Sequence, residues 1–479
     1  MTSESFTTFL ESVSGLVWGP YLLIPLLVGT GLYLTVRLRA LQVRQLGPSL
    51  WLALVKRRES DAEGDISHFQ ALMTALAATV GTGNIAGVAT AIAAGGPGAL
   101  FWMWVTGFLG MATKYAEALL SVRYREVDAH GRMSGGPMYF LARAIPNARL
   151  GRTLAAAFAL FAAVAAFGIG NGVQSLEVAT TLQSSFGFEP LATTFTLAVL
   201  VALVILGGVR SIARFASLIV PAMIVFYMAG AIAVLVVNHD QILRAIAWVF
   251  ESAFSESALG GGLLGASVAA AVRFGFARGI FSNESGLGSA GIAAAAAATR
   301  EPVRQALVSM TQTFIDTLVV CSLTGLAILT AVLSSAEMLG AAEAGSRWQA
   351  LNGAEWTAMA FRESLPGSSG DLIVSISLAL FAFSTMLGWS YYGEKSIQYL
   401  AGVRAVVPYR LLFAVMVVVG PMLFDRSVWV ISDITNGLMA LPNLIGLLIL
   451  SGIVVAETRS YFERRPTLGA PGPGPPRPS

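Results

Sequence analysis

Ala77-Ala78-Thr79-Val80-Gly81-Thr82-Gly83-Asn84-Ile85-Ala86-Gly87 lies in the middle of an apolar segment that is long enough to cross a bilayer. A straight spanning helix would carry Leu or Val here, because a glycine in a helix interior costs about 1 kcal/mol relative to alanine. Non-helical backbone at membrane depth survives only where it is buried in protein or lines a polar cavity. This segment therefore predicts a broken helix at a binding site.

A second glycine-interrupted stretch occurs in the other half of the chain, at Arg273-Phe274-Gly275-Phe276-Ala277-Arg278-Gly279. Interrupted apolar segments in corresponding positions of two halves are typical of secondary transporters built from inverted repeats. We therefore expect a second helix break within 273–279, facing the first.

The composition excludes an ordinary soluble protein. Of the 479 residues, 55% are hydrophobic and 12% are charged, about half the charged share of a soluble domain. The single cysteine, Cys321, excludes a disulfide framework and a cysteine-based metal site. The three histidines are scattered, so neither a resident cofactor nor enzymatic activity is expected.

Eleven apolar runs are candidates to span a hydrocarbon core of roughly 30 Å. They cover 15–36, 69–94, 98–122, 153–180, 191–208, 213–237, 264–298, 304–333, 371–395, 407–424 and 428–456. Two more polar stretches, 240–256 and 340–366, are expected to form short surface helices.

Lys and Arg gather in alternate loops. Six lie in 37–67 and six in 123–152, whereas the loops of the opposite side hold Arg244, Arg347, Arg362 and Arg426. The positive-inside rule then places the N-terminus outside and the C-terminus in the cytoplasm of a multi-pass plasma membrane protein, in bacteria the inner membrane.

The odd helix count predicts how the chain is divided. Five helices cannot return to the side on which they began, so two successive sets of five are inverted relative to each other. We expect an extra helix and cytoplasmic loop in 1–67, the first repeat in 68–237, an extracellular connector in 238–263, the second repeat in 264–456 and a disordered proline-rich cytoplasmic tail in 457–479.

Unwinding a helix frees backbone groups of both signs. Amides near Gly83 and Asn84 would meet a carboxylate at the positive end of a helix dipole. Carbonyls near Ala77 and Val80 would meet a cation or an ammonium group. Donors beside acceptors, without a fixed acid, suit a small zwitterion such as an amino acid.

Ser384 and Thr385 are adjacent hydroxyls in the ninth apolar run. They are candidates to complete a sodium site with the carbonyls of Ala77 and Val80. The alternative is that they bond back to carbonyls of their own helix or to a neighbouring helix, and the sequence leaves both open.

Four stretches carry a resemblance to a known family. They are Val80-Gly81-Thr82-Gly83-Asn84-Ile85-Ala86-Gly87, Ser134-Gly135-Gly136-Pro137-Met138-Tyr139, Phe281-Ser282-Asn283-Glu284-Ser285-Gly286-Leu287-Gly288-Ser289-Ala290 and Gly388-Trp389-Ser390-Tyr391-Tyr392-Gly393-Glu394. With them the chain resembles the alanine or glycine:cation symporters of the amino acid–polyamine–organocation superfamily, over nearly its whole length.

The resemblance implies an all-α membrane protein with the five-plus-five inverted repeat of the neurotransmitter–sodium symporters, preceded by one extra helix. It implies a sodium site at Ala77, Val80, Phe381, Ser384 and Thr385. It implies a substrate pocket at Thr79, Thr82, Gly83, Asn84, Gln174, Phe276, Gly279 and Trp389. Ala78 stands where sodium symporters of the wider fold carry asparagine, which puts a second sodium site in doubt.

Charges inside spans suggest function by default. Lys114 and Glu117 are expected to pair at i,i+3, and Glu284 either braces the seventh run or belongs to an inner gate. Asp316 and Asp433 either satisfy neighbouring helix ends or carry protons.

Sodium-driven uptake of alanine or glycine is the leading hypothesis. The alternative is proton coupling on the same fold, and an integral-membrane enzyme lacks a catalytic cluster. The expected partners are a small neutral amino acid, sodium and the lipid bilayer, without nucleic acid or a required protein partner.

Overall fold

The computed structural model describes residues 3–19, 21–59, 62–254, 268–336, 338, 340, 353–424 and 427–464. Within them the regular structure is helical apart from one two-stranded antiparallel sheet, β1 (Glu126–Val127) with β2 (Met133–Ser134), and an isolated bridge, with turns and loops between the helices. The end of the predicted connector and the tail beyond residue 464 lie outside the described residues. The all-α prediction is confirmed.

The helices up to residue 254 are α1 (Ser3–Val17), α2 (Leu23–Arg37), α3 (Leu41–Arg44), α4 (Leu46–Trp51), η1 (Leu52–Lys56), α5 (His68–Thr79), η2 (Gly83–Gly87), α6 (Val88–Gly95), α7 (Gly98–Arg123), α8 (Pro137–Ala144), α9 (Ala148–Phe167), η3 (Gly168–Gly172), α10 (Val173–Phe186), α11 (Pro190–Ile205), α12 (Gly208–Val237), η4 (His239–Gln241) and α13 (Ile242–Phe254). Those of the second half are α14 (Val268–Asn283), α15 (Ser289–Ala295), α16 (Pro302–Thr313), η6 (Phe314–Cys321), α17 (Ser322–Ser334), α20 (Gly353–Ser364), α21 (Ser369–Ala401), η7 (Val403–Ala405), α22 (Val406–Phe424) and α23 (Ser427–Arg464).

Six helical stretches of the described chain are long and apolar enough to cross a membrane, and the bent pair α5 and α6 makes a seventh. The other predicted runs also become helices, namely α2, α7, α11 and the interrupted α14 and α15. Leu203, Leu218 and Val225 on α11 and α12 are 66–72% exposed. Large apolar side chains at that exposure need an apolar surrounding, so the chain is a multi-pass membrane protein.

The first break falls where the sequence predicts it. α5 ends at Thr79, α6 leads on from η2, and the two halves are bent by 55°. Asn84 Oδ1 accepts a hydrogen bond from the Gly81 amide at 2.9 Å, replacing the helical acceptor lost in the turn. A Cβ on Gly81 would lie 2.3 Å from Thr385 Oγ1, so the turn also requires glycine for close approach to α21.

The predicted second break at 273–279 is wrong, because α14 runs unbroken through these residues. Gly275 and Gly279 instead let α14 pack closely on α7: a Cβ on Gly275 would lie 2.5 Å from the Ala99 carbonyl, and one on Gly279 would lie 2.4 Å from Thr106 Oγ1. Small residues four apart commonly serve such helix contacts in membranes.

The helix is interrupted one turn later, at Glu284–Gly288 between α14 and α15. Glu284, Gly286 and Gly288 have φ of 56°, 90° and 87°, a region that disfavours most side chains. Two broken helices are therefore confirmed, with the second displaced toward the motif that contains Glu284.

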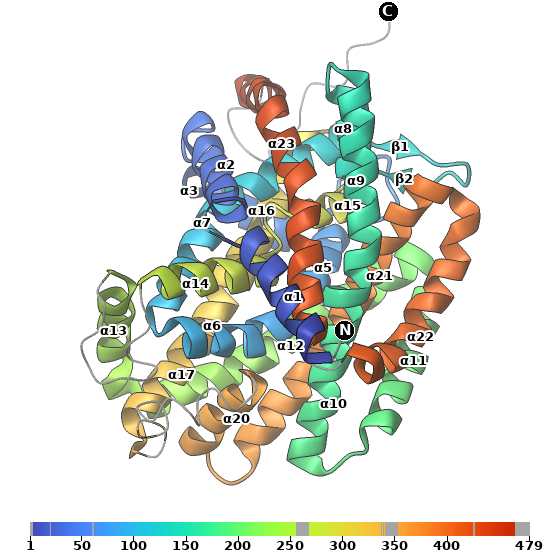
Figure 1. Ribbon diagram of the computed structural model, residues 1–479. Coiled ribbons are helices and arrows are strands. Elements are labelled where there is room, and N and C mark those ends of the chain that lie inside the picture. The colour runs from blue at the N-terminus through green and yellow to red at the C-terminus, as the bar shows by residue number, and fades with distance from the viewer. Residues whose placement is uncertain are drawn as a thin grey trace, which may run out of the picture.

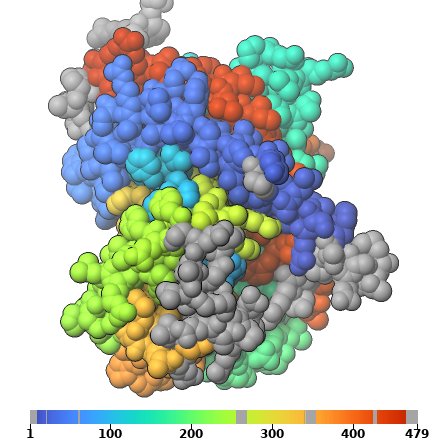
Figure 2. Space-filling view, turned by 60° about the vertical axis from the view of Figure 1, so that its left-hand side comes forward, coloured from blue at the N-terminus to red at the C-terminus, as the bar shows by residue number. Residues whose placement is uncertain are grey.

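Figure 1 shows how the bundle surrounds the first broken helix. α5 contacts α12, α15, α16 and α21, while η2 and α6, which follow the break, contact α14 and α20. The predicted extra helix is divided into α1, which packs on α23, and α2, which packs on α7 and α23. Figure 2 shows this N-terminal segment lying across the surface of the molecule.

Of the two predicted surface helices, 240–256 forms α13. The described part of the other, α20, is not a surface helix, because Trp356 and Phe361 are buried. Thr357 Oγ1 donates to the Ile85 carbonyl at 3.1 Å. α20 therefore covers the half of the first broken helix that follows the break.

Candidate functional site

Five uncharged oxygens from two segments, the end of α5 and the middle of α21, lie beside the first break. Ser384 Oγ lies 3.3 Å from the Ala77 carbonyl and 2.9 Å from the Phe381 carbonyl, and Thr385 Oγ1 lies 3.5 Å from the Val80 carbonyl. A calcium-sized cation, which sodium closely resembles, is held about 2.3–2.6 Å from each oxygen, so ligand oxygens stand roughly 3–3.5 Å apart. The structure thus places Ser384 against the carbonyls of Ala77 and Phe381, and Thr385 against the carbonyl of Val80, as hydrogen-bond donors.

The break itself presents backbone groups beside polar side chains. The Thr82 amide donates to Gln174 Oε1 at 3.3 Å, and Thr79 Oγ1 accepts from Gln312 Nε2 at 2.9 Å. Thr82 Oγ1 is buried without a hydrogen-bond partner. Buried polar groups are normally paired, so this hydroxyl is available to a ligand.

Trp389 on α21 packs against the glycine-rich turn η3. A Cβ on Gly170 would lie 2.1 Å from its Cβ, so the glycine-rich turn η3 is what admits the ring. Trp389 is fully buried, and its Nε1 donates to Glu284 Oε1 at 2.6 Å. The tryptophan thus connects the predicted pocket to the second break.

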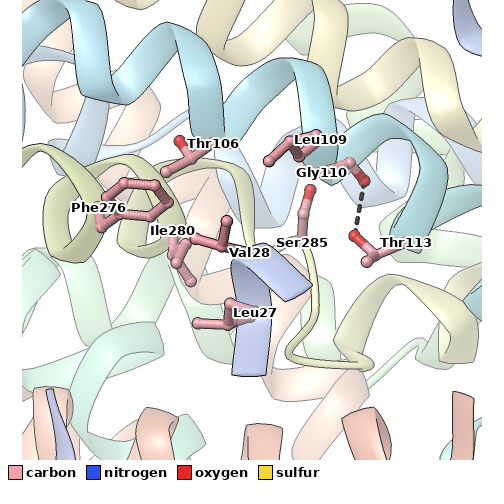
Figure 3. Close-up of a pocket in the computed structure, with 9 residues that line it drawn as sticks. All are labelled: Leu27, Val28, Thr106, Leu109, Gly110, Thr113, Phe276, Ile280 and Ser285. Atoms are coloured by element: carbon pink, nitrogen blue, oxygen red, sulfur yellow. Dashed lines mark hydrogen bonds between the residues drawn. The ribbon is translucent and has the colours of Figure 1, made fainter. Parts of the chain in front are cut away.

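Phe276 and Gly279 do not join the other predicted pocket residues. Phe276 lines a cavity with Leu27, Val28, Thr106 and Ile280 between α2, α7 and α14, as Figure 3 shows, and Gly279 faces Thr106. This cavity measures about 20 Å³, enough for one water but not for an amino acid. Phe276 and Gly279 were predicted to line the pocket because the second break was expected at 273–279. Since α14 is continuous there, both residues lie elsewhere.

The aromatic side chain of α14 that does face the first break is Phe281, five residues later. Its Cδ1 lies 3.3 Å from where a Cβ on Gly83 would stand, beside Ser282. Placing the second break one turn too early hid this residue.

Gln312 of the eighth run was not among the predicted site residues, and Asp316 was expected either to satisfy a helix end or to carry protons. Gln312 Nε2 donates to Thr79 Oγ1 and to the Asn283 carbonyl. Asp316 Oδ1 accepts from Asn84 Nδ2 at 2.8 Å. Their only signal was polarity at membrane depth, which does not reveal what they face.

The second break is held by buried charges. Lys114 Nζ donates to the Glu284 carbonyl at 3.1 Å, and Glu117 Oε1 accepts from the Gly286 amide and Asn443 Nδ2, both at 2.9 Å. The predicted Lys114–Glu117 pair is absent from the described salt bridges. Both side chains instead reach across from α7, because the distorted backbone offers unpaired groups.

Arg278 on α14 and Asp433 on α23 form a largely buried ion pair at 2.9 Å, with 11% and 13% exposure. The Asp433 carboxylate therefore pairs with a charged side chain and does not cap a helix end. Phe281 stacks on Trp429 with ring centroids 4.9 Å apart, and Trp429 Nε1 donates to Glu177 Oε1 at 3.2 Å. Together these side chains connect α10, α14 and α23 over the first break.

Backbone hydrogen bonds pair the segments that flank the two broken helices, 65–66 and 296–298. The Asp65 amide donates to the Ala296 carbonyl at 2.9 Å, and the Ala298 amide donates to the Ile66 carbonyl at 2.7 Å. Arg125 binds four carbonyls around this pairing, those of Glu63, Ala295, Ala297 and Thr299.

Glu59 makes further polar contacts near this backbone pairing. It binds Arg304 at 3.1 Å and His68 at 3.3 Å. Burial alone would raise its pKa, but the hydrogen bond from His68 and the charge of Arg304 prevail and lower the pKa of Glu59 to about 2. The carboxylate is therefore ionised at neutral pH.

Comparisons with known proteins agree with this geometry. The chain matches the sodium:alanine symporter family over residues 3–471. It is 53% identical over 460 residues to the sodium/alanine symporter AgcS of Methanococcus maripaludis, covering 96% of this chain and 98% of that protein. It is 48% identical to an uncharacterized transporter of Haemophilus influenzae, covering 97% of each chain.

Among solved structures, the fold resembles that of MhsT crystallised with L-phenylalanine. The TM-score is 0.59 at 16% identity, covering 83% of this chain and 93% of that one, so the likeness concerns the fold alone. Together with the whole-length family match, these findings show that the chain belongs to the sodium:alanine symporter family.

Proposed function

We propose that this protein transports alanine into the cell together with sodium, and that it also accepts glycine as a substrate. The observation that carries the proposal is the convergence at the first break of five uncharged oxygens with the amides and hydroxyls of Thr79–Asn84. Sodium is the co-transported ion at Ala77, Val80, Phe381, Ser384 and Thr385.

The amino acid lies next to the ion, against Thr79, Thr82, Gly83 and Asn84. Its carboxylate takes the amides that follow the break, where the helix dipole is positive, and its ammonium takes nearby carbonyls and Gln174. Trp389 and Phe281 limit its side chain. One methyl group is worth only about 1–3 kcal/mol in such a pocket, so glycine and alanine both enter.

Transport follows alternating access between two closures. Arg278–Asp433 with Phe281–Trp429 closes the outer end, and the pairing of 65–66 with 296–298 under Arg125 closes the inner end. The repeats 68–237 and 264–456 rock about the midplane. The positive-inside pattern puts the N-terminus outside and the C-terminus in the cytoplasm of the plasma membrane, in a bacterium the inner membrane.

Coupling is a mutual gain in affinity. If sodium raises the affinity for alanine by some factor, alanine must raise the affinity for sodium by the same factor. The Val80 carbonyl belongs both to the ion site and to the break, so occupation of one orders the other.

The test is uptake of labelled L-alanine into proteoliposomes with an inward sodium gradient, with choline replacing sodium at fixed pH as the control. We expect uptake to stop in choline and glycine to compete. The alternative is proton coupling without sodium, for which the buried Asp316 is the relevant observation. Undiminished uptake in choline, driven by an inward proton gradient, would establish that alternative.

A further inference from the structure

Asp316 is a buried acid that connects both broken helices. It lies in the π-helical segment η6, with no exposed surface. Oδ1 accepts from Asn84 Nδ2 at 2.8 Å, and Oδ2 accepts from Ser282 Oγ at 2.9 Å and Thr317 Oγ1 at 2.8 Å. Asn84 Oδ1 in turn accepts a hydrogen bond from the Gly81 amide. The Asp316 carboxylate is therefore connected to the first break through one side chain, that of Asn84.

The charged and titratable groups near Asp316 come from three other positions. Lys114 on α7 lies within electrostatic range of Glu117, Glu284 and Asp316, but its hydrogen bond goes to the Glu284 carbonyl. Cys321 is the titratable group of η6 itself, with Sγ 3.3 Å from Ser282 Oγ and from Asn84 Nδ2. One lysine therefore serves three buried acids, which leaves two of them without a compensating charge at a high cost.

Glu117 and Glu284 are committed to the second break. Glu117 binds the Gly286 amide, and Glu284 binds Ser289 and Trp389. Asp316 is the member of this set that contacts the first break. It therefore responds most directly to what occupies the site.

A proton suits Asp316 better than a metal ion does. All three contacts to its carboxylate are donors, and the Asn84 amide group points its positive end at Oδ1, where a cation would be repelled. A proton on Oδ2 needs only that one of the hydroxyls of Ser282 and Thr317 turn round to accept it, since hydroxyls both donate and accept.

We propose that Asp316 binds a proton in the sodium-free carrier and releases it when sodium and the amino acid bind. The proposal rests on the sodium coupling proposed above. In the release step the O–H bond of the carboxylic acid breaks, the proton leaves to the side to which the site is open, and the carboxylate keeps the electron pair. The positive charge of sodium replaces that of the proton in the buried site.

The proton and sodium then compete, although they bind at different atoms. Reciprocity requires that lowering the pH weaken sodium binding by the same factor by which sodium favours proton release. After the sodium has left on the inner side, Asp316 takes up a proton there, and the empty carrier returns with this carboxyl group neutral.

The first test uses the purified full-length protein in detergent. Labelled alanine binding is titrated with sodium from acidic to mildly alkaline pH. In the wild type the sodium concentration for half-maximal binding should rise about 5- to 150-fold as the pH falls, the usual range of a coupling between sites. In Asp316→Asn it should become independent of pH, while His68→Gln, a control at a buried residue whose partners are Gln305 and Glu59, should keep the dependence.

The second test needs no variant. Sodium and alanine added to the weakly buffered wild type should release about one proton per alanine bound, measured with a pH-sensitive dye. No release at any pH would overturn the proposal, as would a pH dependence that persists in Asp316→Asn or disappears in His68→Gln. Sodium-dependent binding without proton release contradicts only this inference, whereas binding that never needs sodium contradicts the proposed function as well.

Discussion

The two helix breaks are stabilised in different ways. At Val80–Thr82 the turn is held by uncharged groups, among them Asn84, Gln174 and Thr385. At Glu284–Gly288 it is held by Lys114, Glu117 and the side chain of Glu284 itself, and three residues have positive φ. The first break therefore leaves neutral oxygens and amides for ligands, whereas the second uses charge to fix a strained backbone.

We therefore expect the first break to bind ligands and the second to stabilise the fold. Variants of the first break should change ligand affinity more than folding stability, and variants of the second should do the reverse. The predictions below test that contrast, beginning with the largest expected effect.

Replacing Ser384 and Thr385 together by alanine should affect transport most. Two of the five oxygens disappear, so the apparent sodium affinity should fall by roughly 100-fold, the upper end for losing even a supporting group of a metal site. The measurement is alanine uptake as a function of external sodium. Ser396→Ala on the same helix, whose hydroxyl bonds back to the Tyr392 carbonyl, is the control. An unchanged sodium requirement in the double variant would show that sodium does not bind at Ser384 and Thr385.

Lys114→Met should act mainly on stability. It leaves Glu117 and Glu284 buried without their cation, and breaking a buried charge network in this way costs about 3–5 kcal/mol. Unfolding in detergent, followed by heat or denaturant, measures the loss. A stability loss as large in the Ser384/Thr385 double variant would erase the contrast between the breaks.

Arg125→Ala should loosen the backbone pairing of 65–66 with 296–298, which joins the segments that flank both broken helices. Hydrogen bonds to a charged group contribute about 1.5–3 kcal/mol each, so losing one of the four already predicts tenfold faster opening, about 1.4 kcal/mol. Hydrogen–deuterium exchange of the Asp65 and Ala298 amides measures it. Arg123→Ala, which removes an exposed partner of Glu457, should leave that exchange unchanged. Equal exchange in both variants would mean that Arg125 does not stabilise this pairing.

Phe281→Leu and Phe276→Leu form a matched pair with the smallest expected effects. Phe281 lies beside Gly83, so its replacement should relax selectivity for alanine over larger amino acids by up to about tenfold. Phe276 faces α2 and α7, so its replacement should leave selectivity unaltered. Competition of unlabelled amino acids against alanine uptake measures both, and the reverse result would restore Phe276 to the pocket.

Much of the fold could be predicted because the bilayer imposes it. The apolar runs, the odd helix count and the first break follow from length, periodicity and the cost of glycine in a helix. Ala77, Val80, Ser384 and Thr385 were proposed from the residues themselves, and the resemblance added Phe381. The structure places Ser384 against the carbonyls of Ala77 and Phe381, and Thr385 against that of Val80.

The second break was misplaced because glycine has two uses that look the same in a sequence. Gly275 and Gly279 remove side chains so that α14 can approach α7, whereas the real break has Glu284 in a left-handed conformation, stabilised by residues far away in the chain. Contacts such as Lys114 with Glu284, or Asn84 with Asp316, depend on tertiary packing that no local pattern records.

A structure determined with alanine and sodium bound tests the central claim most directly. We predict density for the amino acid against Thr79–Asn84, and for the ion among the oxygens of Ala77, Val80, Phe381, Ser384 and Thr385. Either ligand bound instead at Glu284–Gly288, or in the cavity beside Phe276, would contradict it.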